Sequence, residues 1–441
     1  MSRLAALCLW FVLSLSWSNV QVPGHARAGT APLAATIAQA SSTTPASAAK
    51  AAIDGNRFAT DPTHSWQGTP AERCWWWQVR FPQERTIGAI LQIQGDHAAV
   101  FRNAPRHYLW QASLDGQAWQ DLKETEVTNE RRLFRIHRLS KPCQARFLRL
   151  SILKVEGTFP TLREVEFFAD ARAVIPFGDW IVAVDTTGES KVPRHGDAFI
   201  PLARSCKGWQ GLQAQQLCHR DFDEAFVAAE PRPLCVFLSG NFKDWCQQHR
   251  ADWRGTQEVL TKRNLPMWAA CGGAQGLAIL SEVGVDKPWD CPHCRDPKNP
   301  RLPIYTHIGH TGVKPCGDYS CCLFERGPHN VLQVADDPVF QGLPREFKTV
   351  ESHCGQIEWP PKGWMLIASN GSGSQTKTQC LRVKNRYIYA AQFHIEMAGA
   401  PESSRQIMSN FLKLARDWGG YNPNGKAVVS PDLLSGAEQR R

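Results

Sequence analysis

Two hydrophobic patterns divide the chain. Between residues 37 and 170, short segments alternate apolar with polar positions, and turn signals such as the Asp-Gly pairs at 54–55 and 115–116 separate them. Examples are TIGAILQIQG (86–95), RHYLWQAS (106–113) and ARFLRLSIL (145–153). Alternation with a period of two is typical of strands with one buried face. The pattern therefore predicts an N-terminal β-sandwich over 37–170.

The second pattern begins near residue 178. Its strand candidates are almost entirely apolar, as strands buried on both faces must be, and helical stretches such as DWRGTQEVLTKRN (252–264) lie between them. The candidates are IVAVD (181–185), PLCVFLSG (233–240), LPMWAAC (265–271) and YIYAAQFH (387–394). This order predicts an α/β domain with a parallel sheet over 178–420. The link at 173–178 is short and contains Pro and Gly, so we expect two separable domains with modest mutual contact.

The two ends of the chain differ from its interior. Residues 1–28 carry an early charge at Arg3, an apolar run from Leu4 to Trp17 and small residues at positions 26 and 28, which is typical of a cleaved secretory signal. No later segment approaches the roughly 18 uninterrupted apolar residues of a membrane-spanning helix, so no transmembrane segment is expected in the mature chain. We expect a secreted or periplasmic protein, with a disordered tail at 421–441.

Composition narrows the classes of function. The 441 residues are 43% hydrophobic and 21% charged, which fits a globular chain. The net charge is +9, but the basic residues are scattered, so no nucleic-acid partner is expected. Fifteen cysteines suit an oxidising compartment in which disulfides persist. Cys74 and Cys143 are the two cysteines of the sandwich, and we expect them to form a disulfide.

The segment WAACGGAQGLAIL (268–280) has the layout of a nucleophile turn: an apolar strand, small residues, a cysteine, glycines and a helix. On such a turn Cys271 would stand at the carboxyl edge of the sheet, where the helix N-terminus lowers the pKa of a thiol. Gly272 and Gly273 allow close backbone approach to a substrate. Taken alone, the segment also fits a buried structural cysteine.

The segment AAQFHIE (390–396) offers the partners of a nucleophile. Residues i and i+2 of an extended segment project to the same face, so His394 and Glu396 can face one site. The imidazole would act as the base, and the carboxylate would orient it. A lone histidine at a strand end is more often structural, but the two motifs together favour a Cys-His-Glu triad.

With both motifs in place, region 178–420 resembles the class I glutamine amidotransferase superfamily, which also contains γ-glutamyl hydrolases. The elbow AACGGAQ (269–275) departs from the family's glycine-x-Cys-x-Gly-x-Gln at Ala269, and QFHIE (392–396) has Ile395 where the family has proline. The resemblance implies a flavodoxin-like α/β domain and catalysis without a cofactor. It also implies that LSGNF (238–242) and the elbow supply oxyanion or substrate contacts, namely Gly240, Asn241, Gly272 and Gln275.

The segment 37–170 resembles the discoidin, or coagulation factor type C, domain, a galactose-binding-like jelly-roll. Its strongest pieces are SLDGQAW (113–119) and ARFLRL (145–150). The resemblance implies a carbohydrate or cell-surface glycan as partner, with Trp66, His97 and Arg102 as candidate sugar contacts. It also implies a structural Ca²⁺ held by Asp54, Asn56 and Glu164, because hard oxygen ligands suit calcium. An Asp-Gly turn without an ion is the alternative.

An insert at 286–327 is not required by the amidotransferase core. Cys291 and Cys294 have the spacing of a zinc knuckle, and Cys316, Cys321 and Cys322 could complete a tetrahedral structural Zn²⁺ site. Export favours disulfides instead, and free thiols are the third possibility.

These features predict an exported amide or γ-glutamyl hydrolase that uses Cys271, His394 and Glu396 on a small substrate. The sandwich would target the enzyme to a glycan-rich surface. The chain has neither a nucleotide-binding loop nor a synthase domain, so delivery of ammonia to a synthase is not expected. The alternative is a non-catalytic carbohydrate-binding or adhesion protein in which the amidotransferase-like domain serves as a scaffold.

Overall fold

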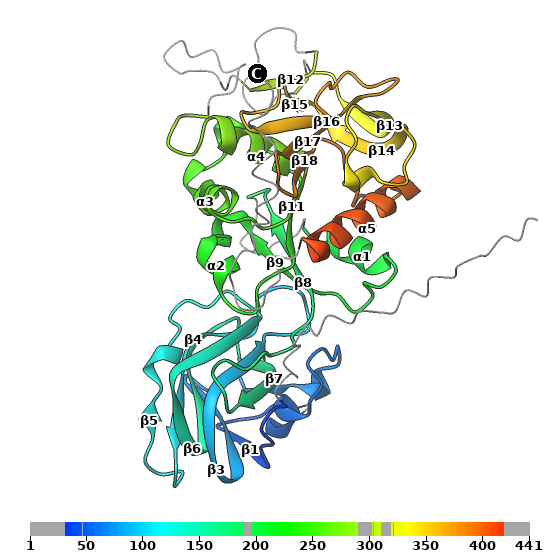
Figure 1. Cartoon of the computed structure of the whole chain (residues 1–441). Coiled ribbons are helices and arrows are strands. Elements are labelled where there is room, and N and C mark those ends of the chain that lie inside the picture. Colours follow the sequence, from blue (N-terminus) through cyan, green and yellow to red (C-terminus); the bar gives the residue numbers. More distant parts are fainter. Residues whose placement is uncertain are drawn as a thin grey trace, which may run out of the picture.

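The computed structural model describes residues 31–45, 47–188, 196–289, 302, 304–309, 319–320 and 322–418. Figure 1 shows a strand-rich lower body that passes into an upper body, where helices flank a central sheet. The expected signal segment, the tail at 421–441 and much of the cysteine-rich insert lie outside the described residues. No helix in the described ranges is long and apolar enough to cross a membrane.

The lower body is an antiparallel sheet with the strand order β2-β7-β3-β6-β4-β5, and β1 pairs with β3. The strands are β1 (Ile37–Ala40), β2 (Trp66–Gln67), β3 (Trp75–Gln94), β4 (Ala104–Ser113), β5 (Gln120–Asp121), β6 (Phe134–Glu156) and β7 (Thr161–Phe168). Buried and exposed positions alternate at the start of β3, but residues 87–94 are all buried. A strand segment buried on both faces has a second layer packed on its outer face.

The upper body holds a mixed sheet with the order β14-β13-β16-β17-β18-β11-β10-β8-β9, in which the strands from β18 to β9 are parallel. Its strands are β8 (Trp180–Asp185), β9 (Gln213–Cys218), β10 (Cys235–Leu238), β11 (Met267–Ala270), β13 (Glu325–Gln333), β14 (Glu346–His353), β16 (Trp364–Asn370), β17 (Cys380–Val383) and β18 (Ile388–Ala391). A separate pair joins β12 (Tyr305–His307) to β15 (Gly355–Ile357). The strands expected at 181–185, 233–240, 265–271 and 387–394 are thus β8, β10, β11 and β18. The flavodoxin-like assignment stays a prediction.

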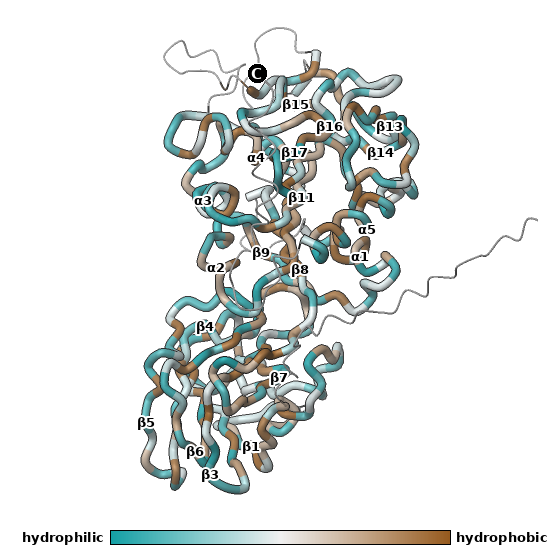
Figure 2. Tube along the Cα trace, viewed as in Figure 1, coloured by the Kyte–Doolittle hydropathy of each residue, from teal (hydrophilic) through white to brown (hydrophobic). Residues whose placement is uncertain are grey.

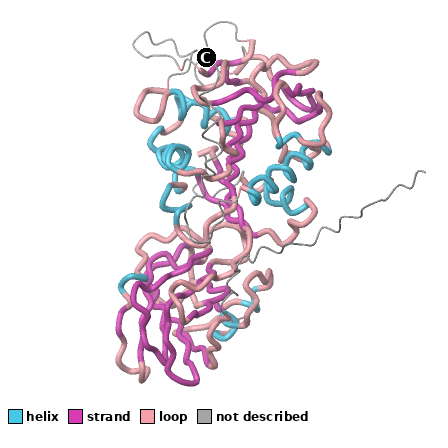
Figure 3. Tube along the Cα trace, in the orientation of Figure 1, coloured by secondary structure: helices cyan, strands magenta, loops and turns pink. Residues whose placement is uncertain are grey.

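Helices cover both faces of the parallel strands, as Figure 3 shows. They are α1 (Phe199–Ser205), α2 (Glu224–Ala228), α3 (Arg254–Lys262), α4 (Gly272–Glu282) and α5 (Glu402–Asp417). Short 3-10 helices lie at Ala49–Ile53, Pro62–His64, Lys123–Thr125, His219–Asp221, Trp245–Gln247, Arg250–Trp253 and Pro338–Phe340. On β8, Ile181 and Ala183 pack with α1 and α5, whereas Val182 and Val184 pack with α2, α3 and α4. In Figure 2 the central strands are accordingly hydrophobic.

The two bodies share one hydrophobic core. Leu91 of β3, Phe134 of β6 and Phe168 of β7 belong to the same buried cluster as Trp180 of β8 and residues of α2 and α3. This cluster is the layer that covers the outer face of residues 87–94. The expectation of modest contact between the two domains is therefore wrong: the apolar outer face of the sandwich is buried against the second domain.

Polar contacts seal the same interface. Arg132 is 1% exposed, and its guanidinium lies over the rings of Trp180 and Phe226. Arg131 pairs with Asp223 at 2.8 Å, and Arg138 pairs with Glu230 at 2.7 Å. The guanidinium of Arg132 also donates to the carbonyls of Glu230 and Pro231. The aromatic rings and these backbone oxygens replace part of the hydration that the cation loses on burial.

The expected disulfide between Cys74 and Cys143 is wrong, because both cysteines are free. Cys74 directly precedes Trp75, which pairs with Ile152, whereas Cys143 pairs with Ile87. Along β6, at about 3.3 Å per residue, these two points on the ladder are roughly 30 Å apart, far beyond the roughly 7 Å between Cα atoms that a disulfide can span.

Candidate active site

Cys271 lies on a sharp turn between β11 and α4. Its backbone has φ 48° and ψ −114°, a left-handed conformation that side-chain-bearing residues rarely adopt. Such strain persists where the surrounding structure enforces it, and it is typical of a nucleophile presented at the end of a strand. The N–H of Cys271 bonds to the carbonyl of Ala391 at 2.8 Å, which ties the turn to β18.

His394 and Glu396 come from the segment that follows β18. The Nδ1 atom of His394 lies 2.6 Å from Oε1 of Glu396, and the imidazole is hydrogen-bonded to the sulfur of Cys271 on its other side. The His394 N–H donates to the carbonyl of Val350 at 2.8 Å, which holds the segment against β14. The structure thus brings together the three residues that the sequence selected.

Electrostatics in this group favour a thiolate and an imidazolium. Burial alone would raise the pKa of Cys271, but the hydrogen bond and charge of His394, together with the charge of His353 and the Gly272 N–H, outweigh it and lower the pKa. Burial would lower the pKa of His394, yet the charge of Glu396 and the bond to Cys271 raise it well above its ordinary value. The N–H of Gly272, at the start of α4, also bonds to the sulfur.

The loop at 239–241 packs directly on the elbow. A Cβ on Gly272 would lie 2.3 Å from Cβ of Asn241, so only glycine allows this approach. A Cβ on Gly240 would lie 3.3 Å from Cε1 of His394 and 3.7 Å from Cβ of Cys271. The loop therefore lies directly beside the Cys271 turn and His394, at the place where an oxyanion loop would lie.

The side chains of two expected contact residues have structural partners. The Gln275 amide donates to the Gly355 carbonyl at 2.9 Å and to Oε1 of Gln392 at 3.1 Å, and its oxygen accepts from Trp245. The Oδ1 atom of Asn241 accepts from the Lys243 N–H and from the Gln248 amide. Only the backbone of Asn241 is left for a substrate role, and Gln275 braces α4.

Sequence reasoning missed the contribution of β14. The thiol of Cys271 lies 3.8 Å from the Ser352 carbonyl, and the charge of the next residue, His353, helps to lower the pKa of Cys271. Both residues belong to the segment VESHCGQIE (350–358), which contains the end of β14. The spacing of Glu351 and His353, two residues apart in an extended segment, was the signal in the sequence that could have identified this strand as part of the site.

The candidate sugar contacts are only partly accessible. Trp66 is fully buried, and its indole N–H donates to the Ser42 carbonyl at 2.9 Å, so the expectation that it stacks on a sugar is wrong. Nδ1 of His97 lies 2.8 Å from the Ala59 carbonyl. The side chain of Arg102 is 61% exposed and pairs with Asp96. Arg102 is thus the most accessible of the three candidates.

The candidate calcium ligands gather at one turn. Oε2 of Glu164 accepts from the Gly55 N–H at 3.2 Å, and Oδ1 of Asp54 accepts from the Asn56 N–H at 2.8 Å. Burial, together with the charges of Glu166 and Asp54, raises the pKa of Glu164 to about 8. A cation between these carboxylates would relieve their repulsion, so the residues fit a hard ion such as Ca²⁺.

Four of the five candidate zinc cysteines, Cys291, Cys294, Cys316 and Cys321, lie outside the described residues. Cys322 is described and half-buried, and its charge acts on Cys354, whose pKa is raised to about 12, mainly by burial. The choice between zinc, disulfides and free thiols therefore stays a prediction.

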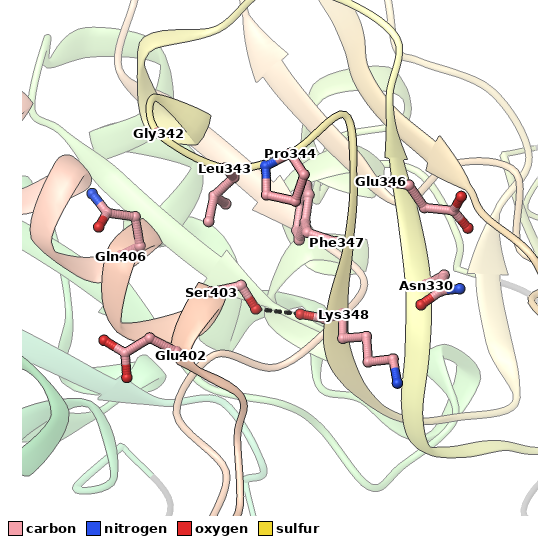
Figure 4. A pocket seen from close by; sticks show the side chains of 10 residues that line it. All are labelled: Asn330, Gly342, Leu343, Pro344, Glu346, Phe347, Lys348, Glu402, Ser403 and Gln406. Atoms are coloured by element: carbon pink, nitrogen blue, oxygen red, sulfur yellow. Dashed lines mark hydrogen bonds between the residues drawn. The ribbon is translucent and has the colours of Figure 1, made fainter.

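Figure 4 shows a pocket away from these groups, between α5 and the β13–β14 ladder. Its volume is about 540 Å³, and Ser403 on one wall donates to the Lys348 carbonyl on the other. No residue of the Cys271 group lines it. The lining residues are Asn330, Gly342, Leu343, Pro344, Glu346, Phe347, Lys348, Glu402, Ser403 and Gln406.

Comparison with known proteins agrees with this two-part description. Residues 37–165 match the F5/8 type C domain, so this part of the chain is a discoidin-like module. The chain is also similar to GMP synthase [glutamine-hydrolyzing] of Thermosipho africanus, with 35% identity over 94 residues, or 20% of this chain and 18% of the relative. The GMP synthase of Thermus thermophilus is 34% identical over 91 residues, or 20% of this chain and 17% of the relative.

The matched stretch spans under a fifth of each of these relatives, and it identifies an amidotransferase-like region. Among solved structures, a protein from Thermoplasma acidophilum, described as one component of a GMP synthase, aligns with 54% of this chain and 95% of its own, at 20% identity and a TM-score of 0.39. A fucose binding module of Streptococcus pneumoniae aligns with 32% of this chain and 96% of its own, at 19% identity and a TM-score of 0.28.

Proposed function

We propose that this protein is an exported cysteine hydrolase of amide or γ-glutamyl bonds, built on a flavodoxin-like amidotransferase domain. The observation that carries the proposal is the Cys271 turn: a strained nucleophile position, hydrogen-bonded to His394, with a pKa held below that of an ordinary thiol despite burial. Its signal-like first residues support the exported location.

In the proposed reaction the Cys271 thiolate attacks the carbonyl carbon of the amide. The oxygen of the tetrahedral intermediate accepts from backbone N–H groups of Gly272 and the loop at Gly240 and Asn241. The His394 imidazolium then gives its proton to the leaving amine, and a thioester remains on Cys271. His394, now neutral and oriented by Glu396, takes a proton from water as the water attacks the thioester, which releases the acid and restores the thiolate.

The test is labelling by a diazoketone analogue of glutamine, followed by assays of glutamine, simple amides and γ-glutamyl peptides. We expect one label per chain at neutral pH, no label in Cys271→Ala, and unchanged labelling in the control Cys74→Ala, which removes an exposed thiol. His394→Ala should slow turnover by about 10²- to 10⁴-fold, the usual size of a general acid–base contribution. A folded wild-type chain that resists the label would favour the scaffold alternative.

We also propose that the discoidin-like module binds a glycan and holds an oxygen-ligated Ca²⁺ at Asp54, Asn56 and Glu164. Support comes from the F5/8 type C match and from the accessible guanidinium of Arg102. The full chain should be retarded by a galactose-containing polymer in native electrophoresis, and Arg102→Ala should lose this retardation. The control Arg73→Ala, an exposed arginine between β2 and β3, should keep it. Equal retardation of all three proteins would refute the assignment of Arg102.

A further inference from the structure

A buried cluster outside the Cys271 group has the chemistry of a metal site. Glu325 lies on β13, and Glu351 and His353 lie on β14; they are 5%, 0% and 5% exposed. The register pairs Glu325 with His353 across the ladder, and Glu351 stands two residues before His353 on the same strand. Cross-strand partners and residues at i and i+2 project to the same face. The antiparallel register therefore gathers all three side chains.

The separations within this cluster are those of neighbouring ligands. Nε2 of His353 lies 2.8 Å from Oε2 of Glu351 and 3.3 Å from Oε2 of Glu325. With metal–ligand bonds of about 2.0–2.2 Å, donors at 90–110° to each other are separated by about 2.8–3.6 Å. One ion can therefore contact the imidazole and both carboxylates with little movement.

The second ring nitrogen of His353 is already committed. Its Nδ1 atom lies 3.0 Å from the carbonyl of Gly355, a contact in which Nδ1 carries the hydrogen and donates it. This contact leaves the lone pair of Nε2 for a metal and fixes the ring plane, which is the usual arrangement around a metal-bound histidine. The same carbonyl accepts from Gln275, so the cluster is linked to α4, the helix that begins beside Cys271.

Charge also favours a cation. Two carboxylates and a neutral imidazole carry −2, and a protonated imidazole still leaves −1 in the interior. Within the described ranges, no lysine or arginine forms an ion pair with Glu325 or Glu351. Oε1 of Glu351 is buried without a hydrogen-bond partner among these residues, which is costly for an ionised oxygen. A divalent ion neutralises the group.

We propose that Glu325, Glu351 and His353 bind one divalent first-row transition-metal ion, such as Zn²⁺ or Mn²⁺. A ligand set of one imidazole and two carboxylates suits these ions. Soft ions such as Cu⁺ prefer thiolates, and Ca²⁺ prefers ligands that are all oxygen. The ion braces β13 against β14 where β14 passes Cys271. This site uses none of the cysteines of the insert and none of the candidate calcium ligands.

The test measures bound Mn²⁺ on the full chain by electron paramagnetic resonance, because Mn²⁺ has little affinity for the thiolates of the insert. Wild type should bind one ion more than Glu351→Gln and one more than His353→Gln. The control His137→Gln replaces another buried histidine, in the lower body, and should bind as wild type does. The ion should also raise the melting temperature of wild type by more than that of the two ligand variants, which keep the candidate calcium site.

Equal binding by wild type and the ligand variants overturns the proposal, and so does a wild-type chain that binds no ion at this site. If the variants do not fold, anomalous diffraction from wild-type crystals grown with Zn²⁺ decides. A peak among the three side chains is expected. The proposal is overturned if zinc is fully bound elsewhere in the crystal, no peak lies among the three side chains, and His353 is hydrogen-bonded directly to both carboxylates. In that case His353 is a protonated imidazole that holds the two carboxylates by charge.

Discussion

Replacing Phe134 by alanine tests whether the two bodies fold as one unit. Phe134 is 1% exposed, and its ring centroid lies 5.0 Å from that of Phe177 and 5.2 Å from that of Trp180. Phe177 lies in the link and Trp180 on β8, so the ring fills the interface itself. Core Phe→Ala changes cost about 3–5 kcal/mol in free energy of unfolding, and part of that cost is the two aromatic contacts, at about 0.5–1.5 kcal/mol each.

Guanidinium unfolding followed by tryptophan fluorescence and by far-ultraviolet circular dichroism gives the measurement. Wild type should unfold in one transition by both probes, because Leu91 and Phe168 of the lower body share a core with the upper body. Phe134→Ala should lose about 3–5 kcal/mol and split the transition, with new proteolysis at the link. The matched control Phe81→Ala, buried against Phe167 within the sandwich, should be destabilised without opening the link. Two separate transitions in wild type would refute the shared core.

Three further outcomes follow from the geometry. Gly272→Ala should abolish reaction of the glutamine analogue, because its Cβ would displace Asn241, whereas Gly211→Ala, with open space around it, should not; equal labelling refutes the close approach. Burial lowers the pKa of His137 to about 3 from 6.5, so below pH 6.5 the unfolded chain binds a proton that the folded chain does not. As the pH is lowered from 6.5, the free energy of unfolding should thus fall by up to about 1.4 kcal/mol per pH unit. In urea titrations at pH 7 and 5, His137→Gln should show a smaller loss of stability between the two pH values than wild type. A chain beginning at residue 174 should aggregate, because it exposes Trp180; a soluble monomer with native fluorescence would contradict this.

Local sequence was sufficient to predict the main buried strands and the residues of the candidate triad around Cys271. The apolar runs at 181–185 and 265–271 read as buried strands because each lacks a polar face, and they form β8 and β11. The Cys271 turn and the pair His394 and Glu396 were also readable, because the turn and the i, i+2 spacing act over a few residues.

What depends on distant segments was decided by the tertiary structure. A tryptophan such as Trp66 can be a sugar platform or a core residue, and only the packing around it places it inside. The continuous burial of 87–94 reflects a neighbour about 90 residues away in sequence, at β8. The antiparallel register of β13 and β14 places Glu325 opposite His353. The register of β3 and β6 holds Cys74 and Cys143 far apart. Alternation along a strand says which residues share a face, but the partner of that face is chosen by burial and hydrogen bonding over the whole fold.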